Sequence, residues 1–478
     1  MAGIEESVKL QLSRATSEQS APAGLPQAAI GKPKCLRTLA DDTSILAGNA
    51  GDNPLVLQLL VQANQCDLAE DFQSRLDEPL YQPSDRLLVR RDNQLIGHVQ
   101  VSKLIAWFHG QRYPIARLQD FVTLPEYRSN NLDAPLLEVA ESVAVNEGAI
   151  LGVVRTERPE WFEHHGWSCC RGQGHTRANT RAILSHLDAQ QTRRSRRTSK
   201  IEVRTWRHFE LDCILRVYQQ VSTNMWGSLQ RSLENWQWLV GRKAHDQILI
   251  AIEHNAETDD DDPTVSGPDN PQQTDTTDVT DLPIVGYAVV RDSCIVEMLT
   301  LPGYARVRAQ LLSQACRDAI DRDHHFVSLH TPAADPMHEL LVTAGGSWIA
   351  DSAASGGQWM LKLLAADRWI ERLYPVLHER AREAGIRRPL EIDLAVGDLS
   401  QQFVLTRRSS RLEGIAGSPV AVQCNWHSLQ DLLTSNLTFP EAIAQGRLRT
   451  PHLSILRTLA ALFPPKLFWQ SPFPLLRR

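Results

Sequence analysis

The stretch "VTLPEYRSNNLDAPLLEVAE", Val122 to Glu141, joins the end of an apolar strand to a polar turn and the start of a helix. After the turn, apolar residues such as Leu136, Leu137 and Ala140 recur at helical spacing. A helix start offers unpaired N–H groups and partial positive charge to an anion, and glycine usually lets the preceding turn approach it closely. This turn contains no glycine. The stretch therefore has the order of a phosphate-binding turn without its usual residue.

Strands and helices alternate on both sides of this stretch. Upstream, "DRLLVRRDNQLIGHVQVS" predicts a hairpin around the turn Arg91–Gln94, and "IARLQDFVTL" predicts the strand that enters the opening turn. Downstream, "AILGVVRT" predicts a short buried strand, and "PEWFEHHGW" predicts a helical turn that ends at Gly166. The expected fold class is α/β (α+β), with strands and helices mixed along the chain.

Composition limits the classes of protein to consider. The 478 residues are 42% hydrophobic and 22% charged, which is typical of about three globular domains. The net charge is −6, and much of the acidic excess lies in residues 255–282. The near-neutral remainder predicts no nucleic-acid partner and no membrane partner. The eight cysteines form no CxxC pair, so we expect no metal site and a cytoplasmic protein with reduced thiols.

Changes in composition divide the chain. "DAQQTRRSRRTSK" is polar and basic and suits a linker, whereas "ETDDDDPTVSGPDNPQQTDTTDVTD" has too little apolar surface to order and interrupts a predicted hairpin. The apolar "GQWMLKLL" gives way to a helix near Ala365. The predicted organisation is a flexible tail at 1–32, a domain at 33–187, a basic linker at 188–200, a second domain at 201–365 with a disordered acidic insertion at 255–282, and a third domain at 366–478.

The order of strand, turn, helix, strand and aromatic helical turn resembles the GNAT family of acetyl-CoA-dependent N-acetyltransferases. The opening stretch and "RTERPEWFEHHGW", Arg155 to Trp167, carry this resemblance. The stretch "LPIVGYAVVRDSCIVEMLTLPGYARVRAQLLSQACRDA" resembles a second, degenerate GNAT unit. The segments "LEIDLAVGDLSQQFVLTRR", "VAVQCNWHSLQDLLTS" and "LTFPEAIAQGRLR" resemble the sterol-carrier-protein-like fold. Tandem GNAT-like mixed-sheet domains followed by such an α+β domain are the arrangement of the enhanced-intracellular-survival (Eis-like) acetyltransferases.

The resemblance implies a reaction and a cofactor site. The expected co-substrate is acetyl-CoA, and the expected acceptor is a small amine or a protein lysine that attacks the thioester directly. Eis-like proteins are often hexameric, which implies a homo-oligomer here. By position, the residues implied to bind the cofactor are Phe121, Val122 and Thr123 in the strand and Arg128, Ser129, Asn130, Asn131, Leu132, Asp133 and Ala134 in the turn.

The turn departs from the family pattern at both glycine positions. Arg128 keeps the family's basic residue, and Asn131 replaces the first glycine with a residue that tolerates left-handed backbone. Asp133 replaces the second glycine, and before Ala134 and Pro135 it is typical of an N-cap. Its carboxylate would face the cofactor pyrophosphate, with a repulsion of about 1–4 kcal/mol per charge pair at 4 Å.

The groups that move protons also differ from the family. The tyrosine that protonates the leaving thiolate in many members corresponds to Phe162, and His164 and His165 are the nearby alternatives. For the base, the resemblance implies the terminal carboxylate, here that of Arg478, and the alternative is Asp120 at the acceptor cleft.

Two hypotheses of function follow. The first is an acetyl-CoA-dependent N-acetyltransferase of the Eis-like type. The second is a catalytically degenerate GNAT-like protein that binds a ligand or acts as a scaffold, as Asp133 and Phe162 suggest. No GxSxG elbow and no GxxxxGK[ST] loop supports a competing hydrolase or nucleotide-binding function.

Overall fold

The computed structural model describes most of the chain. The predicted tail, the acidic insertion 255–282, most of the predicted linker and Arg478 lie outside the described residues. The described ranges are 34–63, 69–192, 200–254, 283–352, 357–386, 390–396, 399–405, 410–414, 422–450 and 455–477.

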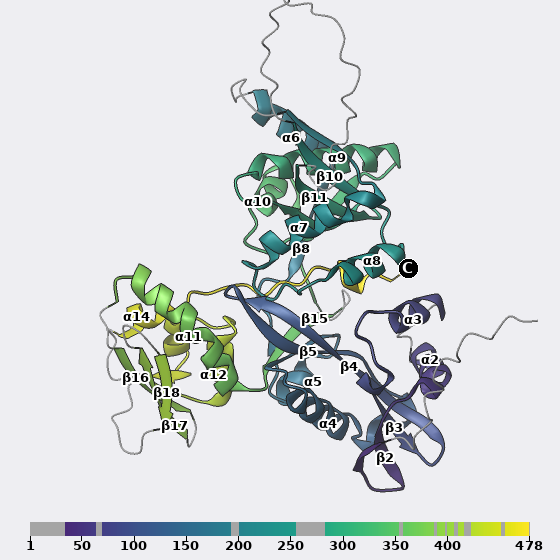
Figure 1. Ribbon diagram of the computed structural model, residues 1–478, viewed down its shortest axis with the longest axis vertical. Coiled ribbons are helices and arrows are strands. Elements are labelled where there is room, and N and C mark those ends of the chain that lie inside the picture. The colour runs from purple at the N-terminus through teal and green to yellow at the C-terminus, as the bar shows by residue number, and fades with distance from the viewer. Residues whose placement is uncertain are drawn as a thin grey trace, which may run out of the picture.

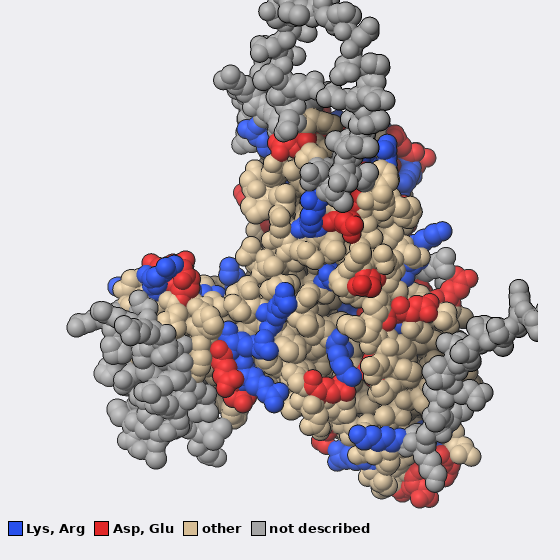
Figure 2. Space-filling model, viewed as in Figure 1, with Lys and Arg blue, Asp and Glu red and all other residues tan. Residues whose placement is uncertain are grey.

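Three lobes, each built on one mixed sheet, make up the molecule (Figure 1). The predicted α/β (α+β) fold class is therefore confirmed. No helix among the described residues is both long and apolar enough to cross a membrane. On the face in Figure 2, basic and acidic side chains are interspersed.

The first lobe contains an eight-stranded sheet covered by helices. In sheet order its strands are β1 (Cys35–Thr38), β2 (Thr43–Ala47), β3 (Arg86–Arg91), β4 (Gln94–Phe108), β5 (Gln111–Thr123), β6 (Leu151–Thr156), β15 (Gln358–Leu363) and β7 (Ser168–Cys169). Its helices are η1 (Ala50–Asp52), α2 (Asn53–Gln62), α3 (Ala69–Leu76), η2 (Pro83–Asp85), η3 (Pro125–Asn130), α4 (Asp133–Asn146) and α5 (Pro159–His164).

Local sequence explains the elements around the opening stretch. The hairpin β3–β4 turns at residues 92–93 as predicted. Helix α4 buries Leu136, Leu137 and Ala140 against the sheet, which confirms the helical spacing. Gly166 ends the α5 turn with φ 82°, a left-handed conformation that favours glycine.

The second lobe repeats part of this design. In sheet order its strands are β14 (Ser347–Ala350), β8 (Gly174–Asn179), β13 (Phe326–Leu329), β12 (Cys294–Thr300), β11 (Ile284–Arg291), β10 (Gln247–His254) and β9 (Lys200–Thr205). Its helices are α6 (Thr180–Thr192), η4 (His208–Glu210), α7 (Leu211–Ser222), α8 (Leu233–Gly241), α9 (Ala305–Asp321) and α10 (Pro336–Thr343). Strand β12 pairs antiparallel with β11 and parallel with β13, just as β5 does with β4 and β6.

The first two sheets exchange strands. Strand β8 pairs with β13 and β14 in the second sheet, whereas β15 returns from the second lobe and pairs with β6 in the first sheet. The chain thus changes sheet between Cys169 and Gly174, and the predicted linker at 188–200 does not coincide with this change. Residues 188–192 belong to helix α6, because that helix packs against α9 of the second lobe.

The third lobe is a smaller α+β unit. Its strands, in sheet order, are β18 (Ser410–Gly414), β17 (Leu399–Leu405), β16 (Leu390–Val396), β19 (Val422–Cys424) and β20 (Leu448–Arg449). Its helices are α11 (Ala366–Glu383), α12 (Trp426–Leu433), α13 (Phe439–Ala444) and α14 (Ile455–Leu462). The likeness of this lobe to sterol-carrier proteins stays a prediction.

The C-terminal segment leaves the third lobe and runs between the other two (Figure 1, yellow). The Trp469 amide donates to the Trp226 carbonyl, and the Phe473 side chain in η7 (Phe473–Leu475) is buried in the core of the second lobe. Residues 468–476 of this apolar segment thus dock against the body of the protein.

Candidate functional site

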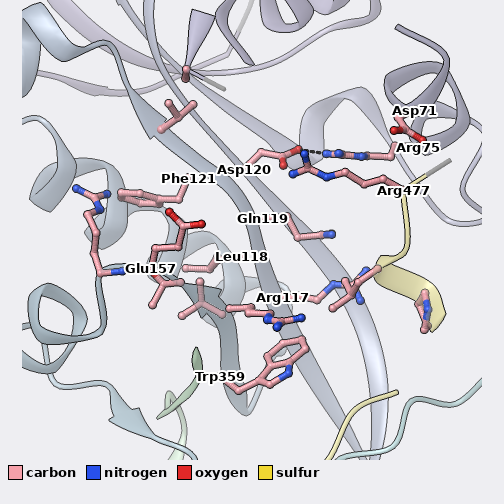
Figure 3. A pocket seen from close by; sticks show the side chains of 18 of the residues that line it. Asp71, Arg75, Arg117, Leu118, Gln119, Asp120, Phe121, Glu157, Trp359 and Arg477 are labelled. Atoms are coloured by element: carbon pink, nitrogen blue, oxygen red, sulfur yellow. Dashed lines mark hydrogen bonds and ion pairs between the residues drawn. The ribbon is translucent and has the colours of Figure 1, made fainter. Parts of the chain in front are cut away.

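A cavity opens where two neighbouring strands of the first sheet separate. Strands β5 and β6 pair in parallel from Ile115 and Leu151 to Leu118 and Val154. Past that point the described residues show no pairing between them. A cavity of about 430 Å³ fills the gap (Figure 3). Its lining includes residues 118–123 of β5 and residues 154–158, which are the end of β6 and the two residues that follow it.

A bulge in β5 shapes the wall of this cavity. His98 faces Val122 and Gln100 faces Gln119, so one residue of β4 lies opposite two residues of β5, Asp120 and Phe121. Asp120 has φ 49°, a left-handed backbone that Asp adopts more readily than most residues other than glycine.

A buried histidine enforces the bulge. His98 Nδ1 lies 2.9 Å from the Asp120 carbonyl oxygen, and its Nε2 lies 3.1 Å from Arg86 Nη1. Because a guanidinium only donates, Nε2 accepts and Nδ1 donates its proton to the carbonyl. Burial, reinforced by the charge of Arg86, lowers the pKa of His98 to about 4, which keeps the ring neutral for this role.

The Asp120 carboxylate points into the site instead of into solvent. It is 8% exposed and lies 2.5 Å from Arg75 Nη1 of helix α3. Figure 3 shows Asp120, Arg75 and Arg477 together on one side of the cavity, with Phe121 and Glu157 on the other. The predicted base is thus part of an ion pair at the cavity wall.

The turn before α4 confirms the backbone conformation predicted for Asn131 and shows that the N-cap predicted at Asp133 was wrong. Asn131 has φ 51°, so it takes the left-handed backbone expected where the family has glycine. Asp133 is not the N-cap: Leu132, at φ −73° and ψ −21°, is already helical, which places Asp133 inside the helix. Its carboxylate instead accepts from Thr123 Oγ1 at 2.5 Å and from Arg158 Nη1 at 2.7 Å.

The structure brings together some, but not all, of the predicted cofactor residues. Phe121, Val122, Thr123 and Asp133 line the cavity, whereas Asn131, Leu132 and Ala134 do not. The side chains of Arg128, Ser129 and Asn130 lie outside what the structure describes. The start of α4 thus reaches the cavity through Asp133, whose charge Arg158 balances.

Among the described residues, no Tyr or His side chain in the cavity takes the place of the missing tyrosine. Phe162 is buried and packs against Phe121 and Trp167. His164 and His165 bond through Nδ1 to carbonyls of their own helix, and neither lines the cavity. Of the described residues that line it, none is a Tyr, His or Cys.

The far end of the cavity is built from segments that no sequence motif connects. Arg75 comes from α3 and Arg117 from β5, Trp238 and Arg242 lie in and just after α8 of the second lobe, and the C-terminal segment reaches it as residues 474–477. Trp359 of the exchanged strand β15 also lines the cavity.

Direct contacts hold this end together. Trp238 Nε1 donates to the Ser74 carbonyl at 2.8 Å, which ties the second lobe to α3. Arg242 donates to the carbonyls of Pro474, at 2.9 Å, and of Leu476, so it fixes the C-terminal segment at the cavity. The predicted carboxylate of Arg478 lies outside the described residues, one residue past this lining.

Glu78 is a titratable group that the sequence did not identify. It lines the cavity, and burial raises its pKa, an effect that Arg117, Arg242 and Arg75 partly oppose. Its Oε1 lies 3.7 Å from Arg117 Nη2. No motif or spacing in the sequence identifies Glu78, because only folding brings the segment between α3 and β3 to the cavity.

Comparisons with known proteins give the fold. No known family model and no curated protein matches the chain. Solved structures match over 90% of this chain and 99% of their own: a GCN5-related N-acetyltransferase from Anabaena variabilis (15% identity, TM-score 0.63), a probable N-acyltransferase from Enterococcus faecalis (13%, 0.66) and Eis1 from Mycobacterium abscessus (12%, 0.59). The chain therefore has the fold of GCN5-related N-acetyltransferases, as the opening stretch predicted.

Proposed function

We propose that the chain is an N-acyltransferase that uses acetyl-CoA and acetylates an amine by direct transfer. The observation that carries this proposal is the cavity between the parted strands β5 and β6, with the α4 turn at one end and a charged pocket at the other. Parted strands leave N–H and C=O groups free to bond an extended chain with amides, as in strand addition. The pantetheine arm of CoA is such a chain.

The reaction needs few groups from the protein. The amine nitrogen attacks the thioester carbonyl, a C–N bond forms, the C–S bond breaks, and CoA leaves as the thiolate. Thiols have a pKa of about 8.5, so the thiolate leaves without a dedicated acid, and the phenylalanine at position 162 is compatible with transfer.

The acceptor must lose a proton before it attacks. Among the described residues we favour Glu78 as the base, because burial raises its pKa and because it lines the end of the cavity opposite the α4 turn, where we place the acceptor. Asp120 is committed to Arg75, so we assign it to positioning. The terminal carboxylate predicted at Arg478 remains a second proposal for the base.

The fit of acetyl-CoA depends on the Asp133–Arg158 pair. The left-handed Asn131 gives the turn the backbone that a phosphate needs, and the carboxylate beside it opposes a phosphate. Arg158, at 2.7 Å, offsets part of the negative charge of that carboxylate. The residues therefore fit the co-substrate with a reduced affinity.

Titration calorimetry with acetyl-CoA tests the proposal, together with thiol release in the presence of a panel of amines. Binding followed by amine-dependent thiol release is the expected result. No heat and no thermal shift at millimolar acetyl-CoA would contradict it and support the degenerate, ligand-binding alternative. Sedimentation equilibrium tests the hexamer that the resemblance implies.

A further inference from the structure

The acceptor end of the cavity contains a buried arginine whose hydrogen-bonding capacity is unfilled. Arg117 lies on β5, and its side chain is 4% exposed. Within the described part of the chain, its Nε and Nη1 atoms have no hydrogen-bond partner. A buried donor without a partner costs about 1–3 kcal/mol, and more when it is charged, so it needs an explanation in a native structure.

The neighbouring acids do not fill this capacity. Glu78 is the acid that pairs with Arg117, and at 3.7 Å from Nη2 the contact is too long for a hydrogen bond. The Asp120 carboxylate is held by Arg75. Burial lowers the pKa of Arg117, in the direction expected of a cation short of compensating charge.

The position of Arg117 in the sheet places it close to the proposed chemistry. It pairs with Val153, one residue before Leu118 and Val154, where β5 and β6 part. Successive residues of a strand are about 3.3 Å apart, so a ligand anchored at Arg117 reaches the point of separation with only a few atoms.

We propose that Arg117 binds a carboxylate on the acceptor, so that the substrate is a small amine that also carries a carboxylate, such as a free amino acid. This assignment rests on the proposed function for the transfer step, but not for the binding of the carboxylate. A carboxylate accepts hydrogen bonds from Nε and Nη1 and neutralises the buried charge. A simple polyamine would leave both atoms unfilled.

Matched substrates test the assignment. L-lysine and cadaverine, L-tyrosine and tyramine, and L-tryptophan and tryptamine differ only by the carboxylate. With acetyl-CoA, we expect kcat/KM to favour at least one carboxylated member by on the order of 10- to 100-fold, the range of a charged hydrogen bond. In Arg117→Gln that ratio should fall to about one. In Arg90→Gln, whose arginine pairs with Asp52 outside the cavity, it should not change.

Binding without acetyl-CoA separates this inference from the proposed function. Calorimetry should detect the preferred amino acid with the wild type, more weakly with Arg117→Lys, and not with Arg117→Gln. Thermal melts of all variants show whether each is folded. If Arg117→Gln does not fold, Arg117→Lys, which keeps the positive charge, still tests the assignment. Amino-acid binding that depends on Arg117, with no thiol release from acetyl-CoA, would contradict only the proposed function. Amine acetylation with equal kcat/KM for both members of every pair would overturn the inference alone.

Discussion

Replacing Asp133 with glycine should tighten CoA binding. Its carboxylate lies in the cavity at the first residue of α4, where a phosphate would meet the helix N-terminus. At about 4 Å, each charge pair between this carboxylate and a diphosphate costs about 1–4 kcal/mol. Arg158, bonded at 2.7 Å but 43% exposed, offsets only part of that cost because water screens it.

The substitution acts in two ways. It removes the repulsion, and it releases Arg158 to donate to a phosphate oxygen. We expect a net gain of about 1–2 kcal/mol, which corresponds to roughly a 5- to 30-fold lower Kd for CoA. The hydrogen bond from Thr123 is lost as well, so the free energy of unfolding should fall by about 1 kcal/mol.

Titration calorimetry with CoA at two salt concentrations measures the effect. The gain should shrink at high salt, and pantetheine, which lacks the diphosphate, should bind the variant and the wild type equally. Asp133→Asn removes the charge at constant size and should reproduce most of the gain. Asp335→Asn is the control, because Asp335 is the N-cap of α10 and pairs with Arg308 in the second lobe, away from the cavity. Wild-type CoA affinity in both Asp133 variants would refute the placement of the phosphate beside this carboxylate.

Three further changes probe the frame around the cavity. His98, with its folded pKa of about 4 below the ordinary 6.5, gives stability that is complete above pH 6.5 and is lost as the pH falls towards 4. The free energy of unfolding from urea titrations should therefore drop by up to about 1.4 kcal/mol per pH unit in that window, and His98→Gln should flatten the slope; an unchanged slope would contradict a buried neutral ring. Glu78→Gln should lower kcat by roughly 100-fold or more and remove the acidic limb of the pH–rate profile, whereas an intact limb would move the base elsewhere. Phe473→Ala should destabilise the second lobe by about 3–5 kcal/mol and expose the C-terminal segment to protease, and equal resistance to cleavage would show that Phe473 does not anchor it.

The sequence by itself determined the elements that depend on near neighbours. Apolar spacing and turn residues are enough to specify the β3–β4 hairpin, the α4 helix and the left-handed Asn131, because backbone conformation and helical periodicity act over a few residues. The likeness of this order to the acetyltransferase fold followed from the same local pattern.

Tertiary structure decided which strands share a sheet and which side chains share the cavity. Strands β8 and β15 are short, and nothing within them specifies a partner, so their exchange between the sheets depends on the packing of both lobes. Glu78, Arg117 and Arg242 meet only because the segment after α3, strand β5 and the end of α8 converge there. The opening stretch shows the same division. Its residues predicted the turn, but Leu132 is already helical, so the helix starts one residue earlier than the N-cap prediction for Asp133 requires. The Asp133 carboxylate therefore accepts hydrogen bonds from Thr123 and Arg158 and does not cap its own helix.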